Sequence, residues 1–172
     1  MPMIIAVMAE LLVFLCAMWF LIFLSTLMHE LGHALGYMLA TGDGDWHIRV
    51  GWGKRLLHTN KLTVNLIAFD GVFTPSERKI DTRAKRIMTL SGGPVVSLLL
   101  VLVLSGLRFG GFSFRSDILA DGVIEFFLNS AFFVNLYILL LSVIPVHYFY
   151  GEVKGMETDG LQIIHALKKD GD

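Results

Sequence analysis

The residues of this chain best suited to chemistry are His29, Glu30 and His33, which form a His-Glu-x-x-His motif at the end of a long apolar run. On a helix, residues four apart share one face, so both imidazoles can bind one metal ion while Glu30 lies beside it. Two histidines leave one protein ligand to be found and one position open for a water, whose pKa the metal lowers towards neutrality. The motif therefore predicts a hydrolytic zinc site in which Glu30 takes the proton of that water.

Two aspartates are candidates for the third ligand. One is Asp159, in Thr158-Asp159-Gly160, and the other is Asp70, which precedes Gly71. Either carboxylate suits zinc, but Asp159 also fits the cap of a following helix, and Asp-Gly is a common turn. The apolar run before Asp159 would return it to the membrane face where the His-containing helix ends, so this topology permits Asp159 to be a ligand. Asp70 is the alternative metal ligand.

The composition indicates a membrane protein. The 172 residues are 55% hydrophobic and only 17% charged, with a mean hydropathy of +0.66. This length corresponds to a single domain, 1–172. A net charge of −1 argues against nucleic acid as a partner. Cys16 is the one cysteine, which excludes an internal disulfide and a thiolate zinc cluster.

Three segments are long and apolar enough to cross a bilayer as helices. They are about 3–40, which ends with the His-Glu-x-x-His motif, about 87–107 and about 126–146. The second contains Gly92, Gly93 and Pro94, which predict a kink or an opening within the membrane. The lipid bilayer is therefore an expected partner of this chain.

The basic residues predict the orientation of these spans. The polar loop 41–86 carries nine of the fourteen Lys and Arg residues, so the positive-inside rule places it in the cytoplasm. The amino terminus and the return at 108–121 then lie outside. The segment 147–172, with a helix beginning near Asp159, lies on the cytoplasmic side.

Within this loop, apolar and polar residues alternate in 48–52 and again in 62–69, with the polar stretch 54–60 between them. A period of two is typical of β-strands, so we expect a short β-hairpin at the membrane surface, with Trp46 and Trp52 in the interface. The edge of this hairpin can pair with an extended substrate, or the hairpin can be purely structural.

Two polar residues of the third span, Asn135 and Ser142, lie seven apart and hence on one helix face. Polar groups in a bilayer should point at the bundle interior or at a ligand. Hydrogen bonds between helices explain them equally well.

Several of these features occur together in one known family. The chain resembles the site-2 protease family of intramembrane zinc metalloproteases over nearly its whole length. The motifs that carry the resemblance are His29-Glu30-Leu31-Gly32-His33 at the end of a span, Gly93-Pro94 in the next, and Ser142-Val143-Ile144-Pro145 followed by Thr158-Asp159-Gly160.

The resemblance implies an all-α membrane protein, in which three transmembrane helices form that family's core, with a short interfacial β-hairpin and a C-terminal helix on the cytoplasmic side. It implies one Zn²⁺ per chain held by His29, His33 and Asp159, with Glu30 as the general base. It also places Gly71 on the edge that pairs with substrate.

The family's Asn-x-x-Pro reads Ser142-x-x-Pro145 here. Ser142, or Asn135 in its place, is therefore the candidate for binding substrate or stabilising the transition state.

The implied function is that of a zinc metalloendopeptidase in a bacterial or archaeal cell membrane. Its substrate would be a membrane protein or peptide, such as a regulatory protein, a signal-peptide remnant or a peptide precursor. A regulatory partner or a homo-oligomer is compatible with this function. The alternative is a non-proteolytic membrane protein of protease ancestry that binds a partner or acts as a scaffold.

Overall fold

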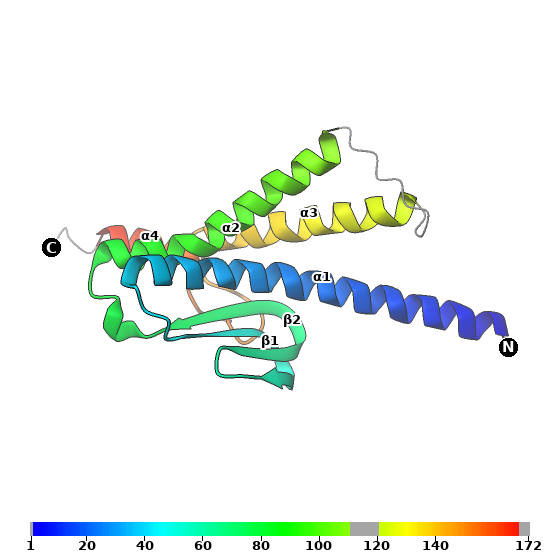
Figure 1. Ribbon diagram of the computed structural model, residues 1–172, viewed down its shortest axis with the longest axis horizontal. Coiled ribbons are helices and arrows are strands. Elements are labelled where there is room, and N and C mark those ends of the chain that lie inside the picture. The colour runs from blue at the N-terminus through cyan, green and yellow to red at the C-terminus, as the bar shows by residue number, and fades with distance from the viewer. Residues whose placement is uncertain (1, 111–120, 169–172) are drawn as a thin grey trace.

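Three long helices and a small sheet make up most of the molecule. The computed structural model describes residues 2–110 and 121–168 (Figure 1). Three of its helices are long and apolar enough to cross a membrane, as the sequence predicts. The elements, in chain order, are α1 (Pro2–Thr41), β1 (Trp46–His58), β2 (Leu62–Pro75), a 3-10 turn (Glu77–Lys79), α2 (Arg83–Phe109), α3 (Asp121–Val143) and α4 (Asp159–Lys168).

Helix α1 is long because nothing in its sequence stops it before Thr41. Its side chains from Met3 to Leu15 are largely exposed, as expected of a helix that faces lipid. It ends where Gly42 adopts a φ of +69° and donates its N–H to the Met38 carbonyl at 2.9 Å. The two histidines of the motif therefore lie eight and twelve residues before the helix end, on rigid helical backbone.

Helices α2 and α3 differ at their ends from the predicted spans. Helix α2 begins before residue 87, because the Thr82 side chain caps it by accepting from the Lys85 N–H at 3.3 Å. Helix α3 ends at Val143 rather than 146, since Pro145 cannot continue a helix. The predicted outer return, 108–121, falls mostly on residues 111–120, which lie outside the described residues.

Glycines allow α1 and α2 to pack closely. A Cβ on Gly32 would lie 2.8 Å from the Gly92 carbonyl carbon, and one on Gly36 would lie 3.3 Å from the Met88 carbonyl carbon. Helix α2 continues through Pro94, and Figure 1 shows it running beside α1 over its first half and diverging afterwards. The close approach therefore occurs next to His29 and His33.

The predicted hairpin is present and longer than its pattern indicates. The stretch 54–58 continues β1 instead of forming the turn, which is confined to the residues between His58 and Leu62. Pairing is more complex than in a simple hairpin, because 46–50 pairs with 71–75 on one side and with 62–64 on the other. Positive φ angles at Gly51 and Gly53 let the strand curl back in this way.

The sheet packs against α1 through a small apolar core. Ile48 and Val50 of β1 and Ala68 of β2 pack with Ala34 of α1. This buried cluster is surrounded by partly buried side chains, which are Trp19, Phe23, Leu27, Trp46, Leu62 and Phe73. The Thr26 hydroxyl also donates to the Ala68 carbonyl at 3.3 Å. This docking fixes the edge 71–75 of β2 beside the histidine motif.

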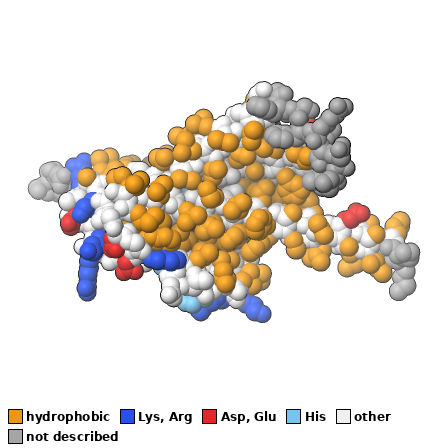
Figure 2. All heavy atoms as spheres, in the orientation of Figure 1, with side chains coloured by type: hydrophobic (Ala, Val, Ile, Leu, Met, Phe, Trp, Pro, Cys, Tyr) orange, Lys and Arg blue, Asp and Glu red, His pale blue; other side chains and the backbone are white. Residues whose placement is uncertain are grey.

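The surface separates apolar and charged regions. Figure 2 shows apolar side chains covering the helices, while Lys and Arg gather at the end of the molecule near α4 and below the sheet. This distribution, together with three long apolar helices, fits a membrane protein.

Candidate metal centre

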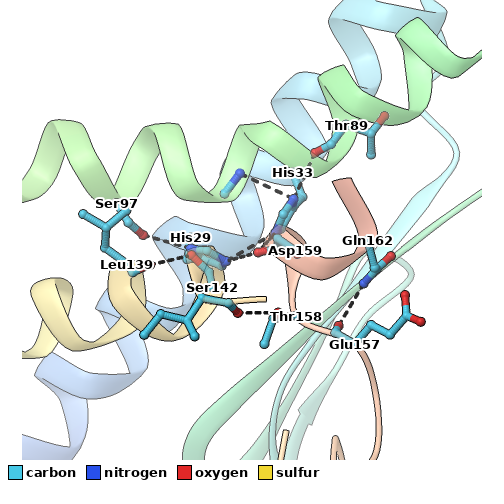
Figure 3. Close-up of polar contacts among 12 residues, drawn as sticks. His29, His33, Thr89, Ser97, Leu139, Ser142, Glu157, Thr158, Asp159 and Gln162 are labelled. Atoms are coloured by element: carbon cyan, nitrogen blue, oxygen red, sulfur yellow. Dashed lines mark hydrogen bonds and ion pairs between the residues drawn. The ribbon is translucent and has the colours of Figure 1, made fainter. Parts of the chain in front are cut away.

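Three side chains from opposite ends of the chain converge on one point (Figure 3). Nε2 of His29 lies 3.3 Å from Nε2 of His33, and Oδ2 of Asp159 lies 3.3 Å from each of these nitrogens. All three residues are buried, with at most 9% of each exposed. The group can hold a metal ion, and it contains Asp159 rather than Asp70, as the sequence predicts.

The spacing of these three atoms fits a tetrahedral ion. Ligand atoms about 2.0–2.1 Å from a central zinc lie about 3.3–3.4 Å from one another. The three separations in the structure match this value. Two nitrogens and one oxygen also leave the fourth corner of the tetrahedron free.

Contacts behind the imidazoles orient them for this role. Nδ1 of His33 lies 2.9 Å from the Thr89 carbonyl, which can only accept; a neutral His33 that donates from Nδ1 to this carbonyl presents a lone pair at Nε2. Nδ1 of His29 lies 2.8 Å from the Ser97 hydroxyl, which can accept in the same way. Three acceptor atoms then face one another at 3.3 Å with no donor between them, an arrangement that a cation stabilises.

Asp159 reaches the site because the connection from α3 folds back on itself. The Thr158 hydroxyl donates to the Ile144 carbonyl at 2.7 Å and accepts from the Val146 N–H at 3.2 Å. This places the first residue of α4 against the histidines.

Gly93 leaves room for an ion. A Cβ at this position would lie 2.7 Å from Nε2 of His29 and would also collide with the ring of His33. Any larger residue here would occupy the space between α2 and the two imidazoles. Helix α2 is continuous here, so Gly93 makes room for an ion by lacking a side chain.

The group opens into a cavity of about 450 Å³. Glu30, which is 6% exposed, forms part of its wall beside His29, His33 and Asp159. The β2 edge contributes Gly71, Val72, Phe73 and Pro75, and the connection after α3 contributes Tyr148, Val153 and Met156. A Cβ on Gly71 would lie 2.6 Å from Cγ of Glu30, so the start of this edge directly contacts the predicted base.

The other predicted residues lie around the cavity at different distances. Asp70 is not part of the group that can hold an ion; it interacts with Arg49 at 3.4 Å and lines a small adjoining cavity. Ser142 lines a small adjoining cavity of about 50 Å³ with His29 and Glu30, and its hydroxyl donates to the Leu139 carbonyl at 3.0 Å.

Asn135 belongs to a different region. Its Nδ2 donates to the Ser25 hydroxyl at 3.1 Å and to the Ala131 carbonyl at 2.8 Å. It lines a separate apolar cavity between the helices and is not among the residues around the histidines. The contact with Ser25 is the helix–helix hydrogen bond that the sequence offered as the second interpretation.

Sequence reasoning assigned no role to Ser97, Thr89 or Tyr148. Ser97 is fully buried against His29 although the two residues are 68 positions apart. Tyr148 lines the cavity, and burial raises the pKa of its hydroxyl, so it stays a neutral donor. One sign was present in advance: Ser97 stands where the family that the chain resembles commonly has an Asn after Gly-Pro.

Comparisons with protein-family models, with curated proteins and with solved structures found no match to this chain.

Proposed function

We propose that this protein is an intramembrane zinc metalloprotease of the site-2 protease type, which hydrolyses peptide bonds of membrane-embedded substrates. The observation that carries the proposal is the triangle of His29, His33 and Asp159, whose three donor atoms lie 3.3 Å apart. A carboxylate beside the triangle, in a cavity that a peptide can enter, distinguishes a catalytic site from a structural metal site.

A bound zinc ion would supply Lewis acidity to the scissile carbonyl and a water of lowered pKa. The residues of the chain do the remaining work. Glu30, buried next to the ligands, accepts a proton from the attacking water and later delivers one to the leaving amine. Ser97 and the Thr89 carbonyl hold the imidazoles with Nε2 directed at the ion.

The β2 edge provides a place for the substrate backbone. Residues 71–75 pair with 46–50 on one side, and their other side borders the cavity. A transmembrane substrate has its amides paired within its own helix, so it must unwind before attack. Adding the unwound segment to this edge as a further strand would satisfy its amides and place its carbonyl near Glu30.

The site lies below the membrane surface in this proposal. At 1.5 Å per residue, His33 and His29 are roughly 12 and 18 Å before the helix end at Thr41. The basic loop 41–86 then lies in the cytoplasm and the amino terminus outside, as the positive-inside rule predicts.

The test compares wild type with Glu30→Gln, both purified into lipid nanodiscs. We expect wild type to cleave a fluorogenic transmembrane peptide and Glu30→Gln to retain zinc but lose cleavage. Membrane peptides that accumulate only in cells carrying Glu30→Gln would identify natural substrates. Equal cleavage by both proteins would refute the role of Glu30, and zinc without cleavage in either would favour a non-proteolytic scaffold.

A further inference from the structure

The cavity at the metal centre adjoins a second cavity. The second has a volume of about 490 Å³ and shares three wall residues, Ile80, Arg86 and Glu157, with the first. Its remaining wall comes from the start of α2 and from α4, through Asp81, Thr82, Arg83, His165 and Ala166. The two cavities together extend from the histidines to the charged end of the molecule.

The β2 edge follows the same path. Its residues Gly71, Val72, Phe73 and Pro75 all line the first cavity, with Gly71 against Glu30 and Pro75 opposite Trp46 near the charged end. A strand advances about 3.3 Å per residue, so a peptide paired along this edge moves about 13 Å from the base over four residues. Its side chains then reach the wall that the two cavities share.

The two acidic residues that line the second cavity, Asp81 and Glu157, are already paired. Oδ1 of Asp81 lies 2.7 Å from Nζ of Lys85, and Oε1 of Glu157 lies 3.1 Å from Nδ1 of His165. The hydrogen bond from Lys85 holds the pKa of the Asp81 carboxyl below its usual range. This carboxyl is therefore ionised and already bound to Lys85.

Arg86 differs from these residues. It is exposed, and its guanidinium has no ion-pair or hydrogen-bond partner within the described ranges 2–110 and 121–168. A guanidinium stays charged at any physiological pH and binds carboxylates through two parallel hydrogen bonds. The shared wall thus presents a charged donor at the point where the substrate path leaves the metal centre.

We propose that Arg86 determines substrate specificity by binding an acidic side chain of the substrate, about three to five residues from the cleaved bond on the polar side. The inference rests on the proposed protease function, whose substrate class it narrows. Membrane segments with Glu or Asp at this distance are preferred over segments with Lys at the same place.

The test uses two peptides that differ only in Glu or Lys at this position. Their binding to the Glu30→Gln protein, in nanodiscs of neutral lipid, is measured by fluorescence anisotropy. We expect the Glu peptide to bind about tenfold more tightly, because a hydrogen-bonded charge pair is worth about 1.5 kcal/mol or more. Adding Arg86→Gln should remove the difference, and adding Arg86→Glu should reverse it.

Arg78→Gln is the matched control, because Arg78 is exposed in the 3-10 turn and lines neither cavity. It should leave the preference unchanged. Equal binding of both peptides, binding of neither, or a preference that survives Arg86→Gln would overturn the inference. Zinc content, measured on every variant, confirms that the site is folded.

Binding to the Glu30→Gln protein does not depend on turnover, so the two proposals can fail separately. Cleavage by the wild type of both peptides at the same kcat/KM would refute the specificity and keep the protease. Preferential binding without any cleavage by the wild type would refute the protease, and Arg86 would then be a determinant of binding to an acidic membrane partner.

Discussion

The hydroxyl of Ser97 lies 2.8 Å from Nδ1 of His29, and this contact directs Nε2 of the ring at His33 and Asp159. Groups that orient a metal-binding histidine from behind commonly change metal affinity by about 10- to 100-fold when removed. We therefore predict that Ser97→Ala weakens zinc binding by that factor, measured by competition with a chromophoric chelator. Ser142→Ala is the control, because Ser142 is equally buried but donates to its own helix. Equal affinities in both variants would contradict this role.

Gly93→Ala should abolish stoichiometric zinc binding. The added methyl group would lie between α2 and the imidazoles, in contact with both Nε2 atoms. Gly106→Ala, in the same helix, adds the same group where no atom lies within 4 Å, and it should bind one zinc per chain. The measurement is metal content after purification and dialysis. Full zinc occupancy in Gly93→Ala would mean that the ion lies elsewhere.

Gly71→Ala should lower cleavage and leave zinc in place. A methyl group at Gly71 would displace the Glu30 carboxyl, and a displacement of about 1 Å can cost about 100-fold in rate. Gly44→Ala is the control, since nothing lies within 4 Å of its Cβ position. Cleavage rates on one fluorogenic peptide, with zinc content measured beside them, test the prediction. Loss of zinc from Gly71→Ala would show a structural effect instead.

The pH dependence of stability should reveal the environment of Asp70. Burial raises the pKa of its carboxyl above the usual 3.8, and Arg49 opposes this effect only in part. The native state then binds the proton more tightly than the unfolded chain, so wild type loses stability as the pH rises from about 3.8 through the native pKa. Asp70→Asn has no carboxyl that can ionise here. Its melting temperature should therefore rise relative to that of wild type as the pH increases through this range. A constant difference between the two proteins would disprove the assignment.

Much of the fold could be predicted because its signals are local. Uncharged apolar runs predict the three long helices, and period-two alternation predicts the sheet. The curled pairing of β1 could not be predicted, because the positive φ angles at Gly51 and Gly53 act through contacts on both sides of the strand. The end of α3 was missed by three residues, although Pro145 marks it.

The candidate site divides in the same way. The spacing of His29 and His33 predicts a shared face. The return of the chain to that side of the membrane permits Asp159 as a ligand, and the resemblance to a known family selects it. The contacts of Ser97 and Thr89 join residues 68 and 56 positions apart, and no periodicity encodes them. For Asn135, the sequence pattern fits two interpretations equally well: contact with a ligand, or a hydrogen bond between helices. In the structure Asn135 makes the hydrogen bond, to Ser25.

The most direct test of the account is the zinc content of the purified protein in three forms: wild type, Asp159→Ala and Asp70→Ala. We predict about one zinc per chain in wild type and Asp70→Ala, and a loss of most of it in Asp159→Ala, because Asp159 alone of the two carboxylates faces both imidazoles. Zinc retained in Asp159→Ala and lost in Asp70→Ala would contradict the proposed centre.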